Sequence, residues 1–109
     1  MELNTGRIKM FVEMHIKKIN TIRDVSHKLR IPYDVLRKEF LRLERTPLGD
    51  FILKTKIRVI KEHLLMHDDP CFRICDEYGL RGDTGARVFK RLTGTTMRKY
   101  RMRRRKKAS

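Results

Sequence analysis

The stretch FKRLTGTTMRKY at residues 89–100 repeats, with changes, the stretch FLRLERTPLGDF at residues 40–51. Each contains F-x-R-L and ends in an aromatic residue eleven positions after its first Phe. The same offset of 49 residues aligns apolar positions upstream, namely Val25 with Ile74, Leu29 with Tyr78 and Ile31 with Leu80. Because apolar positions coincide while surface positions differ, the repeat predicts two copies of one buried scaffold.

The first copy predicts a helix-turn-helix unit. Thr21 is the expected N-cap of a helix over residues 22–29, whose apolar residues recur at helical spacing. Pro32 disfavours helical backbone at Ile31 and suits the start of a new helix. That next helix runs through Leu36, Phe40 and Leu43. Arg30 must make the turn between them as a non-glycine residue, at some local cost.

The second copy predicts the same unit with different turn chemistry. Asp69 is the expected N-cap, with Pro70 in the first turn of the helix. Gly79 stands where a left-handed turn residue belongs. The following helix runs through Phe89 and Leu92, and we interpret F-x-R-L as the buried end of this helix in both copies.

A long helix is expected between the copies and a shorter one before them. An apolar stripe from Phe51 to Leu65 predicts one helix over residues 48–66, which would be about 28 Å long. Neighbouring major-groove segments of B-DNA recur every ~34 Å, so this helix could hold two reading helices one turn apart. The predicted domains are 1–47, the linker helix 48–66, 67–102 and a basic tail 103–109. We expect a helix over residues 6–19 and a frayed chain over residues 101–109.

The charge of the chain points to a polyanionic partner. Its 109 residues carry a formal net charge of +15, and RKYRMRRRKK at 98–107 supplies 8 of the positive charges without an acid. No apolar run approaches the ~18 residues of a membrane span, and no secretion signal is present, so we expect a cytoplasmic protein. Cys71 and Cys75 are four residues apart on one helix face, where a disulfide is geometrically disfavoured, and are expected to be reduced thiols.

Three stretches resemble the DNA-binding domain of the AraC family of bacterial transcription activators. They are TIRDVSHKLRIPYDVLRKEF at 21–40, DEYGL at 76–80 and FKRLTGTTMRKYR at 89–101. The last is similar to the family signature F-K-R-x-x-G-x-T-P-x-x-Y-R, with Met97 in place of the proline. Three further departures are Pro32, where the family usually has a Ser cap, Gly85, where it usually has a core aromatic residue or Leu, and the stretch from Leu80 to Phe89, which is one residue shorter than usual.

The resemblance implies an all-α fold of two helix-turn-helix subdomains joined by a linker helix. It also implies sequence-specific binding to adjacent major grooves of double-stranded promoter DNA, often as a monomer, and contact with RNA polymerase. We therefore expect a transcription regulator, either standing alone or as part of a longer chain.

The helical wheel selects candidate DNA-binding residues on the outward faces of the two second helices. In the first copy the candidates are Tyr33, Asp34, Arg37, Lys38 and Arg42. In the second copy they are Asp83, Ala86, Arg87, Lys90 and Arg91. Arg and Lys suit guanine, Asp can accept a hydrogen bond from cytosine, and Ala can contact a thymine methyl group. Arg42 is expected on a phosphate rather than on a base.

Other site chemistries are weaker. His63, His67, Cys71 and Cys75 have zinc-ligand residue types at four-residue spacing, but Pro70 should break the helix that would align them. Asp24, Ser26 and His27 diverge by 100° steps around a helix and cannot form a triad. We therefore expect no enzyme, no catalytic residue, no metal and no cofactor.

Two alternatives to sequence-specific DNA binding stay open. One is a basic RNA-binding protein, although single-stranded RNA readers usually expose aromatic residues for stacking and most aromatics here are assigned to cores. The other is an interaction module that has lost DNA reading through Gly85 and a shortened second unit. It would bind DNA weakly and nonspecifically, with uniform loss at high salt.

Overall fold

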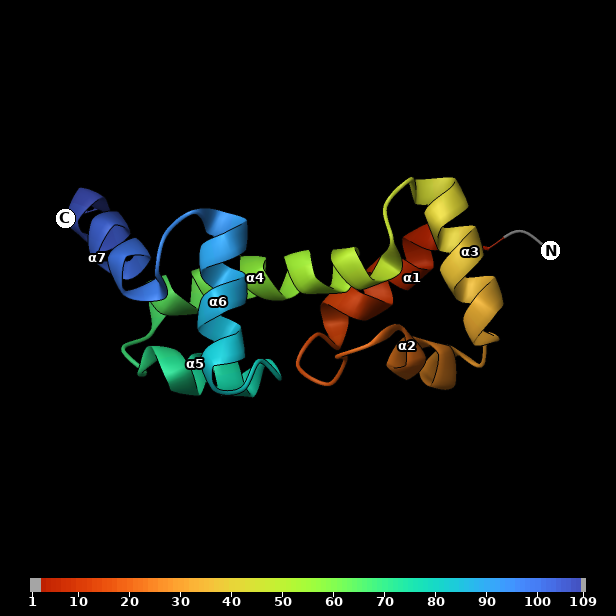
Figure 1. Cartoon of the computed structure of the whole chain (residues 1–109), viewed down its shortest axis with the longest axis horizontal. Coiled ribbons are helices and arrows are strands. Elements are labelled where there is room, and N and C mark those ends of the chain that lie inside the picture. Colours follow the sequence, from red (N-terminus) through yellow and green to blue (C-terminus); the bar gives the residue numbers. More distant parts are fainter. Residues whose placement is uncertain (1–2, 109) are drawn as a thin grey trace. The chain divides into compact units, whose positions relative to one another are not determined.

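A computed structural model describes residues 3–108, with side chains up to Arg105. Over these residues the chain forms helices and no strands, which confirms the predicted all-α class (Figure 1). The helices are α1 (Thr5–Met14), α2 (Ile22–Leu29), α3 (Tyr33–Glu44), α4 (Leu48–Met66), α5 (Cys71–Glu77), α6 (Asp83–Thr93) and α7 (Met97–Ala108). The predicted linker helix 48–66 matches α4 at both ends. No helix in the described range has both the length and the apolar character needed to cross a bilayer.

The chain forms two compact units, and the boundary falls inside α4 between Thr55 and Lys56. The first unit contains α1, α2, α3 and the N-terminal part of α4, and the second contains the rest of α4 with α5, α6 and α7. Within each unit a short helix packs against the longer helix that follows it, α2 against α3 and α5 against α6. These are the two predicted helix-turn-helix pairs.

The first unit begins its helix-turn-helix as the sequence predicts. The Thr21 side chain accepts a hydrogen bond from the Asp24 backbone N–H, and the Asp24 carboxylate accepts one from the Thr21 N–H, which forms a capping box. Arg30 makes the turn in the left-handed region at φ 56°. The α3 helix then buries Leu36 and Phe40 completely.

The N-terminal helix is shorter than expected. The prediction of a helix over residues 6–19 is wrong at its end, because α1 stops at Met14 and His15 leaves helical geometry. The burial pattern nevertheless continues, since Ile16 and Ile19 are buried after the helix has ended. His15 itself is exposed. The apolar pattern thus runs past the last helical residue and does not mark the end of the helix.

The second unit starts its helix-turn-helix differently from the prediction. Pro70, not Asp69, occupies the N-cap position of α5, where no side chain caps the helix. The Asp69 carboxylate instead lies 3.2 Å from Nε2 of His63. Gly79 adopts φ 78°, as its place in the turn predicts. The first helices of the two pairs therefore have different N-caps: α2 has a side-chain cap and α5 has none.

The aromatic residues of the repeat pair within their own units. The rings of Phe40 and Phe51 lie 6.0 Å apart, and those of Phe89 and Tyr100 lie 5.8 Å apart. Each pair fixes the second helix of the helix-turn-helix to the helix that follows it. The prediction that the Leu of F-x-R-L is buried in both copies is wrong for Leu92, which is 40% exposed, and Leu43 is only partly buried.

Gly85 allows α6 to approach α5 closely. A Cβ atom built on Gly85 would lie 2.7 Å from the Leu80 carbonyl oxygen and 2.9 Å from Cβ and Sγ of Cys75. Those distances are shorter than any side chain tolerates, so the helix crossing requires glycine here. Met97 fills the adjacent space with its Sδ atom 3.2 Å from Cys75 Sγ.

The basic tail is helical further than expected, because α7 continues to Ala108, the last described residue. Arg101 donates hydrogen bonds to the carbonyl oxygens of Leu64, His67 and Asp69. Arg105 donates to those of Leu64 and His67. The last carbonyls of a helix lack intrahelical partners and attract cations, so these two arginines cap the C-terminus of α4.

Candidate nucleic-acid interface

The α3 helix exposes the residues that the sequence selects for DNA contact. Asp34, Arg37, Lys38 and Arg42 are exposed, and Tyr33 is half-buried at the first position of the helix. Leu36 and Phe40 occupy the opposite, buried face. The outward face therefore offers three cations and one carboxylate to a partner.

Two side-chain contacts modify this face. Nε and Nη2 of Arg42 donate to the same carboxylate oxygen of Glu39 at 2.9 and 2.7 Å, so a phosphate would compete with this ion pair. The guanidinium of Arg23, on α2, lies over the Tyr33 ring, 4.7 Å from its centre. Arg23 thus adds a cation beside the N-terminus of α3, and no spacing rule in the sequence indicates it.

The α6 helix presents a similar face in the second unit. Asp83, Ala86, Arg87, Lys90 and Arg91 are all exposed, while Gly85 and Phe89 are buried on the other side. A groove of about 350 Å³ borders Ala86, Arg87 and Lys90 and is closed by Thr96–Arg98 at the start of α7. Arg98 therefore joins the candidate residues, although the sequence placed it only within a general run of basic residues.

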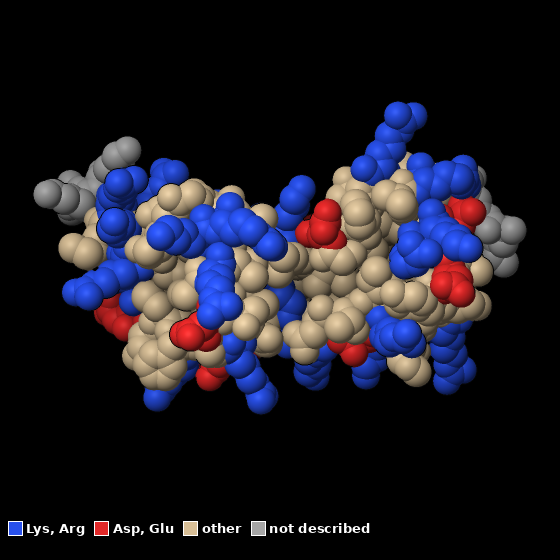
Figure 2. Space-filling model, viewed as in Figure 1, with Lys and Arg blue, Asp and Glu red and all other residues tan. Residues whose placement is uncertain are grey.

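Positive charge is spread over both units. Figure 2 shows Lys and Arg side chains over much of the face drawn, with Asp and Glu in small separate patches. Not all of the tail charge is available to a partner, because Arg101 and Arg105 bind α4 and Arg105 pairs with Asp68 at 2.6 Å. The hydrogen bond from Arg105 lowers the pKa of the Asp68 carboxyl group. Arg103 and Arg104 remain exposed on α7.

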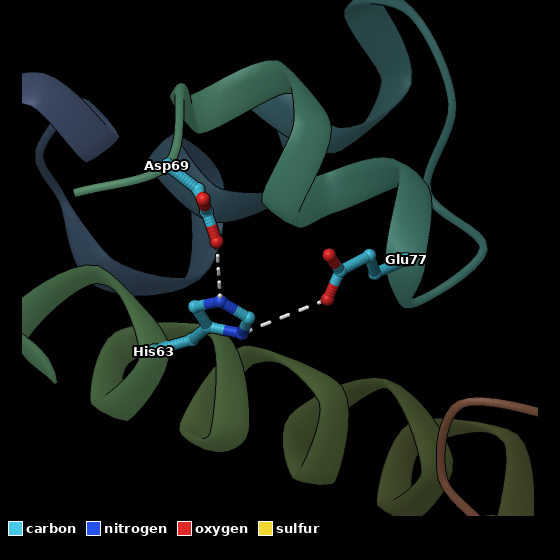
Figure 3. A group of neighbouring side chains, drawn as sticks. All are labelled: His63, Asp69 and Glu77. Carbon is cyan, nitrogen blue, oxygen red and sulfur yellow. Dashed lines mark hydrogen bonds and ion pairs between the residues drawn. The ribbon is translucent and has the colours of Figure 1, made fainter. Parts of the chain in front are cut away.

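His63, Asp69 and Glu77 form a cluster that sequence spacing did not predict (Figure 3). One donor atom from each lies within 4.8 Å of the others, a set that could hold a cation. The carboxylates, however, face different ring nitrogens: Asp69 lies 3.2 Å from Nε2 and Glu77 lies 3.9 Å from Nδ1. One ion cannot take both nitrogens of a ring, so this geometry suits an imidazole that ties α4 to the start and end of α5.

The two cysteines are both free thiols. Burial raises the pKa of Cys75 to about 11, so this thiol is protonated at neutral pH and inert as a nucleophile. Cys71 is partly exposed beside Arg101. The zinc arrangement of His63, His67, Cys71 and Cys75 does not form among these residues, because α4 ends at Met66 and α5 begins at Cys71. The partners of His63 and Cys75 lie elsewhere.

Solved structures share this fold. The C-terminal domain of AraT, a response regulator from Geobacillus stearothermophilus, matches with a TM-score of 0.79 and 18% identity over 89% of this chain and 82% of that one. A DNA-binding transcriptional dual regulator from Escherichia coli K-12 matches with a TM-score of 0.77 and 19% identity, over 89% of this chain and 87% of that one. No protein-family model and no curated protein sequence matches the chain. At these identities the likeness establishes the fold.

Proposed function

We propose that this chain is the DNA-binding domain of a transcription regulator, with α3 and α6 as its two major-groove recognition helices. The observation that carries the proposal is the repeated geometry. Each unit buries one face of its second helix and leaves charged side chains exposed on the opposite face, in a chain of net charge +15. The E. coli neighbour is described as a DNA-binding transcriptional regulator, which supports the same reading.

The residues have distinct roles in this proposal. Arg37 and Lys38 on α3, and Arg87 and Lys90 on α6, read base edges, and Asp34 and Asp83 reject sites that lack a suitable donor. Arg23, Arg42 and Arg98 hold phosphates and set the register. The similarity of the sequence to the AraC family further suggests a cytoplasmic bacterial activator that binds DNA as a monomer and contacts RNA polymerase.

Selection from random duplex DNA at physiological salt tests the proposal. Two enriched elements about 10 base pairs apart would support two working recognition helices. One short enriched element would mean that only one unit contacts bases specifically. No enrichment, with affinity falling steeply as salt rises, would contradict the proposal and leave a nonspecific polyanion binder. Competition with structured RNA in the same buffer would separate DNA binding from RNA binding.

Matched variants on α6 and α3 sharpen the test. Replacing Arg87 by Ala should relax preference at one base pair by ~1–3 kcal/mol, whereas Arg42→Ala should weaken all duplexes alike. The control is Lys54→Ala, which removes an exposed cation from α4 instead. An equal loss on selected and random duplex for Arg87→Ala would refute its base-reading role.

A further inference from the structure

A cationic cavity lies in the second unit on residues to which the proposed DNA reading gives no role. Its volume is about 300 Å³, and it is enclosed by Lys61 of α4, the turn Thr93–Thr95, and Tyr100, Arg103 and Arg104 of α7. The candidate positions on α6 run from Asp83 to Arg91, and the cavity begins just beyond them, at Thr93.

The cavity concentrates positive charge without neutralising it. Three of its lining side chains are cations, and no Asp or Glu among the described residues lines it. Arg101 and Arg105, on the same helix, are engaged with backbone carbonyls of the second unit. Lys61, Arg103 and Arg104, by contrast, form no ion pair with a described carboxylate. Cations held together in this way are stabilised by an anion placed between them.

Tyr100 holds two of the cations in place. Nζ of Lys61 lies 5.8 Å from the centre of the Tyr100 ring, and the Arg104 guanidinium lies 5.7 Å from it. The ring is itself fixed against Phe89, which is fully buried. Cation–π contacts of this kind restrict long side chains before any ligand arrives, which lowers the entropic cost of binding.

The turn that closes the cavity has little hydrogen-bonding capacity left. The Thr93 hydroxyl donates to the Phe89 carbonyl, and the Gly94 N–H donates to that of Lys90. The charged donors of the cavity are therefore the ammonium and the two guanidinium groups. The planar guanidinium fork matches the oxygens of a phosphate group, and a lysine adds a compact charge beside it.

We propose that this cavity is a binding site for a phosphate group, contributed either by the DNA backbone or by a small phosphorylated molecule. Lys61 and Arg104 are its principal ligands, and Arg103 closes it from the adjacent position on α7. The proposal does not depend on sequence-specific DNA reading.

Calorimetric titration of the whole chain with inorganic pyrophosphate, at constant ionic strength and without DNA, tests the site. Saturable binding is expected, and Lys61→Gln and Arg104→Gln should each weaken it about tenfold. The control is Lys99→Gln, which removes one charge from the exposed surface of α7 outside the cavity. Circular dichroism would establish that each variant is folded, and Arg103→Gln gives a third probe at an exposed position. No saturable binding, or an equal loss for Lys99→Gln, would overturn the proposal.

A second titration of the protein with duplex DNA already bound distinguishes the two sources of the phosphate. If pyrophosphate displaces the duplex, and Arg104→Gln lowers the salt dependence of DNA affinity by about one phosphate, the site holds the DNA backbone. If pyrophosphate binds without displacing the duplex, the site takes a small phosphorylated molecule. Each outcome supports a phosphate site and assigns its source.

Discussion

The two helix-turn-helix units pack their helix pairs with different side chains at corresponding positions. In the first, Leu36 of α3 is completely buried. At the repeated position of the second stands Gly85, and α5 and α6 approach until a Cβ atom would no longer fit. Around that position Ser26 of the first unit corresponds to Cys75, and Leu48 corresponds to Met97. Cys75 lies directly beside the glycine, and Met97 contacts Cys75. The second unit thus accommodates the smaller side chain through the close approach of its two helices.

The helix ends differ in the same way. Thr21 caps α2 through its side chain, and the corresponding Pro70 begins α5 without one. Ile52 is buried in α4, whereas the corresponding Arg101 binds the carbonyls at the end of α4. The second unit therefore uses polar contacts of α7 where the first uses apolar burial. Substitutions at these paired positions can test the comparison.

The largest effect is expected from Leu36→Ala in the first unit. Removing a fully buried Leu should lower the free energy of unfolding of this unit by about 2–5 kcal/mol, because the cavity it leaves cannot collapse completely. Chemical denaturation combined with hydrogen exchange, which reports α3 and α6 separately, measures the loss. Val35→Ala, at an exposed neighbour, should change it by less than about 0.5 kcal/mol. Similar losses for the two variants would contradict the assigned core.

Gly85→Ala should destabilise the second unit by about 1–3 kcal/mol, although alanine is the better helix former. The added Cβ would meet the Leu80 carbonyl and Cys75, neither of which is the free end of a flexible side chain. Gly49→Ala in α4 is the matched control, since its Cβ would meet only Ile22 Cδ1 at 4.0 Å. That variant should be stabilising by up to about 1 kcal/mol. Thermal unfolding of both variants decides whether close approach explains the glycine.

Arg101→Gln should lower the stability of the second unit by about 1–2 kcal/mol, because the carbonyl of Leu64 in α4 and those of His67 and Asp69 just after it lose a charged donor. Arg98→Gln removes an equal charge from an exposed position of α7 and should have little effect on unfolding. Urea denaturation at low and high salt distinguishes the loss of these hydrogen bonds from the general effect of removing one charge. If both variants unfolded like the parent, α7 would not cap α4 in solution.

Thr21→Ala should cost the first unit about 1 kcal/mol through loss of the capping box. The effect should appear as reduced hydrogen-exchange protection in α2, with α5 unchanged. Thr84→Ala, at an exposed position inside α6, is a control in which a threonine is lost without a cap. Reduced hydrogen-exchange protection in α5 alone would contradict the assignment of Thr21 as the cap of α2.

The smallest effect at neutral pH is expected at Cys75. Burial holds its pKa at about 11 in the folded chain, above the ordinary value of 9.0, so the unfolded chain releases the proton first. Its contribution to stability is complete below pH 9 and is lost as pH rises towards 11. Melting temperatures measured over that range should fall more for the parent than for Cys75→Ser, whose side chain resembles the corresponding Ser26. Parallel curves for the two proteins would show that the thiol is not buried.

The local sequence predicted much of the fold because its signals act within a few residues. Helical spacing identified the second helices of both pairs, and α4 was predicted from Leu48 to Met66. The Thr21 cap and the left-handed turns at Arg30 and Gly79 were also predicted. The prediction failed where a distant partner decided the outcome. Asp69 leaves its expected cap for His63, and α7 is ordered by carbonyls more than thirty residues away.

The candidate interface could also be predicted where local spacing decides it, and not where contacts join different helices. Helical periodicity predicted that all ten candidate residues lie outside the buried faces of α3 and α6, and none of them is buried. Their roles on DNA remain proposals. The sequence could not indicate Arg23 above Tyr33, or the meeting of Lys61 with Arg104 at Tyr100, because those contacts join different helices.

The sequence by itself determined the number of units, their all-helical character and the net positive charge, because composition and periodicity are properties of the chain. Tertiary structure alone decided which charges are available. Lys56 is buried and donates to the carbonyl of Tyr78, while Arg101 and Arg105 cap α4. Arg104 has the same side chain as Arg105 and directly precedes it on the helix, yet it lines an open cavity. A side chain's charge is set by its chemistry, but its partner is set by which helices the fold brings together.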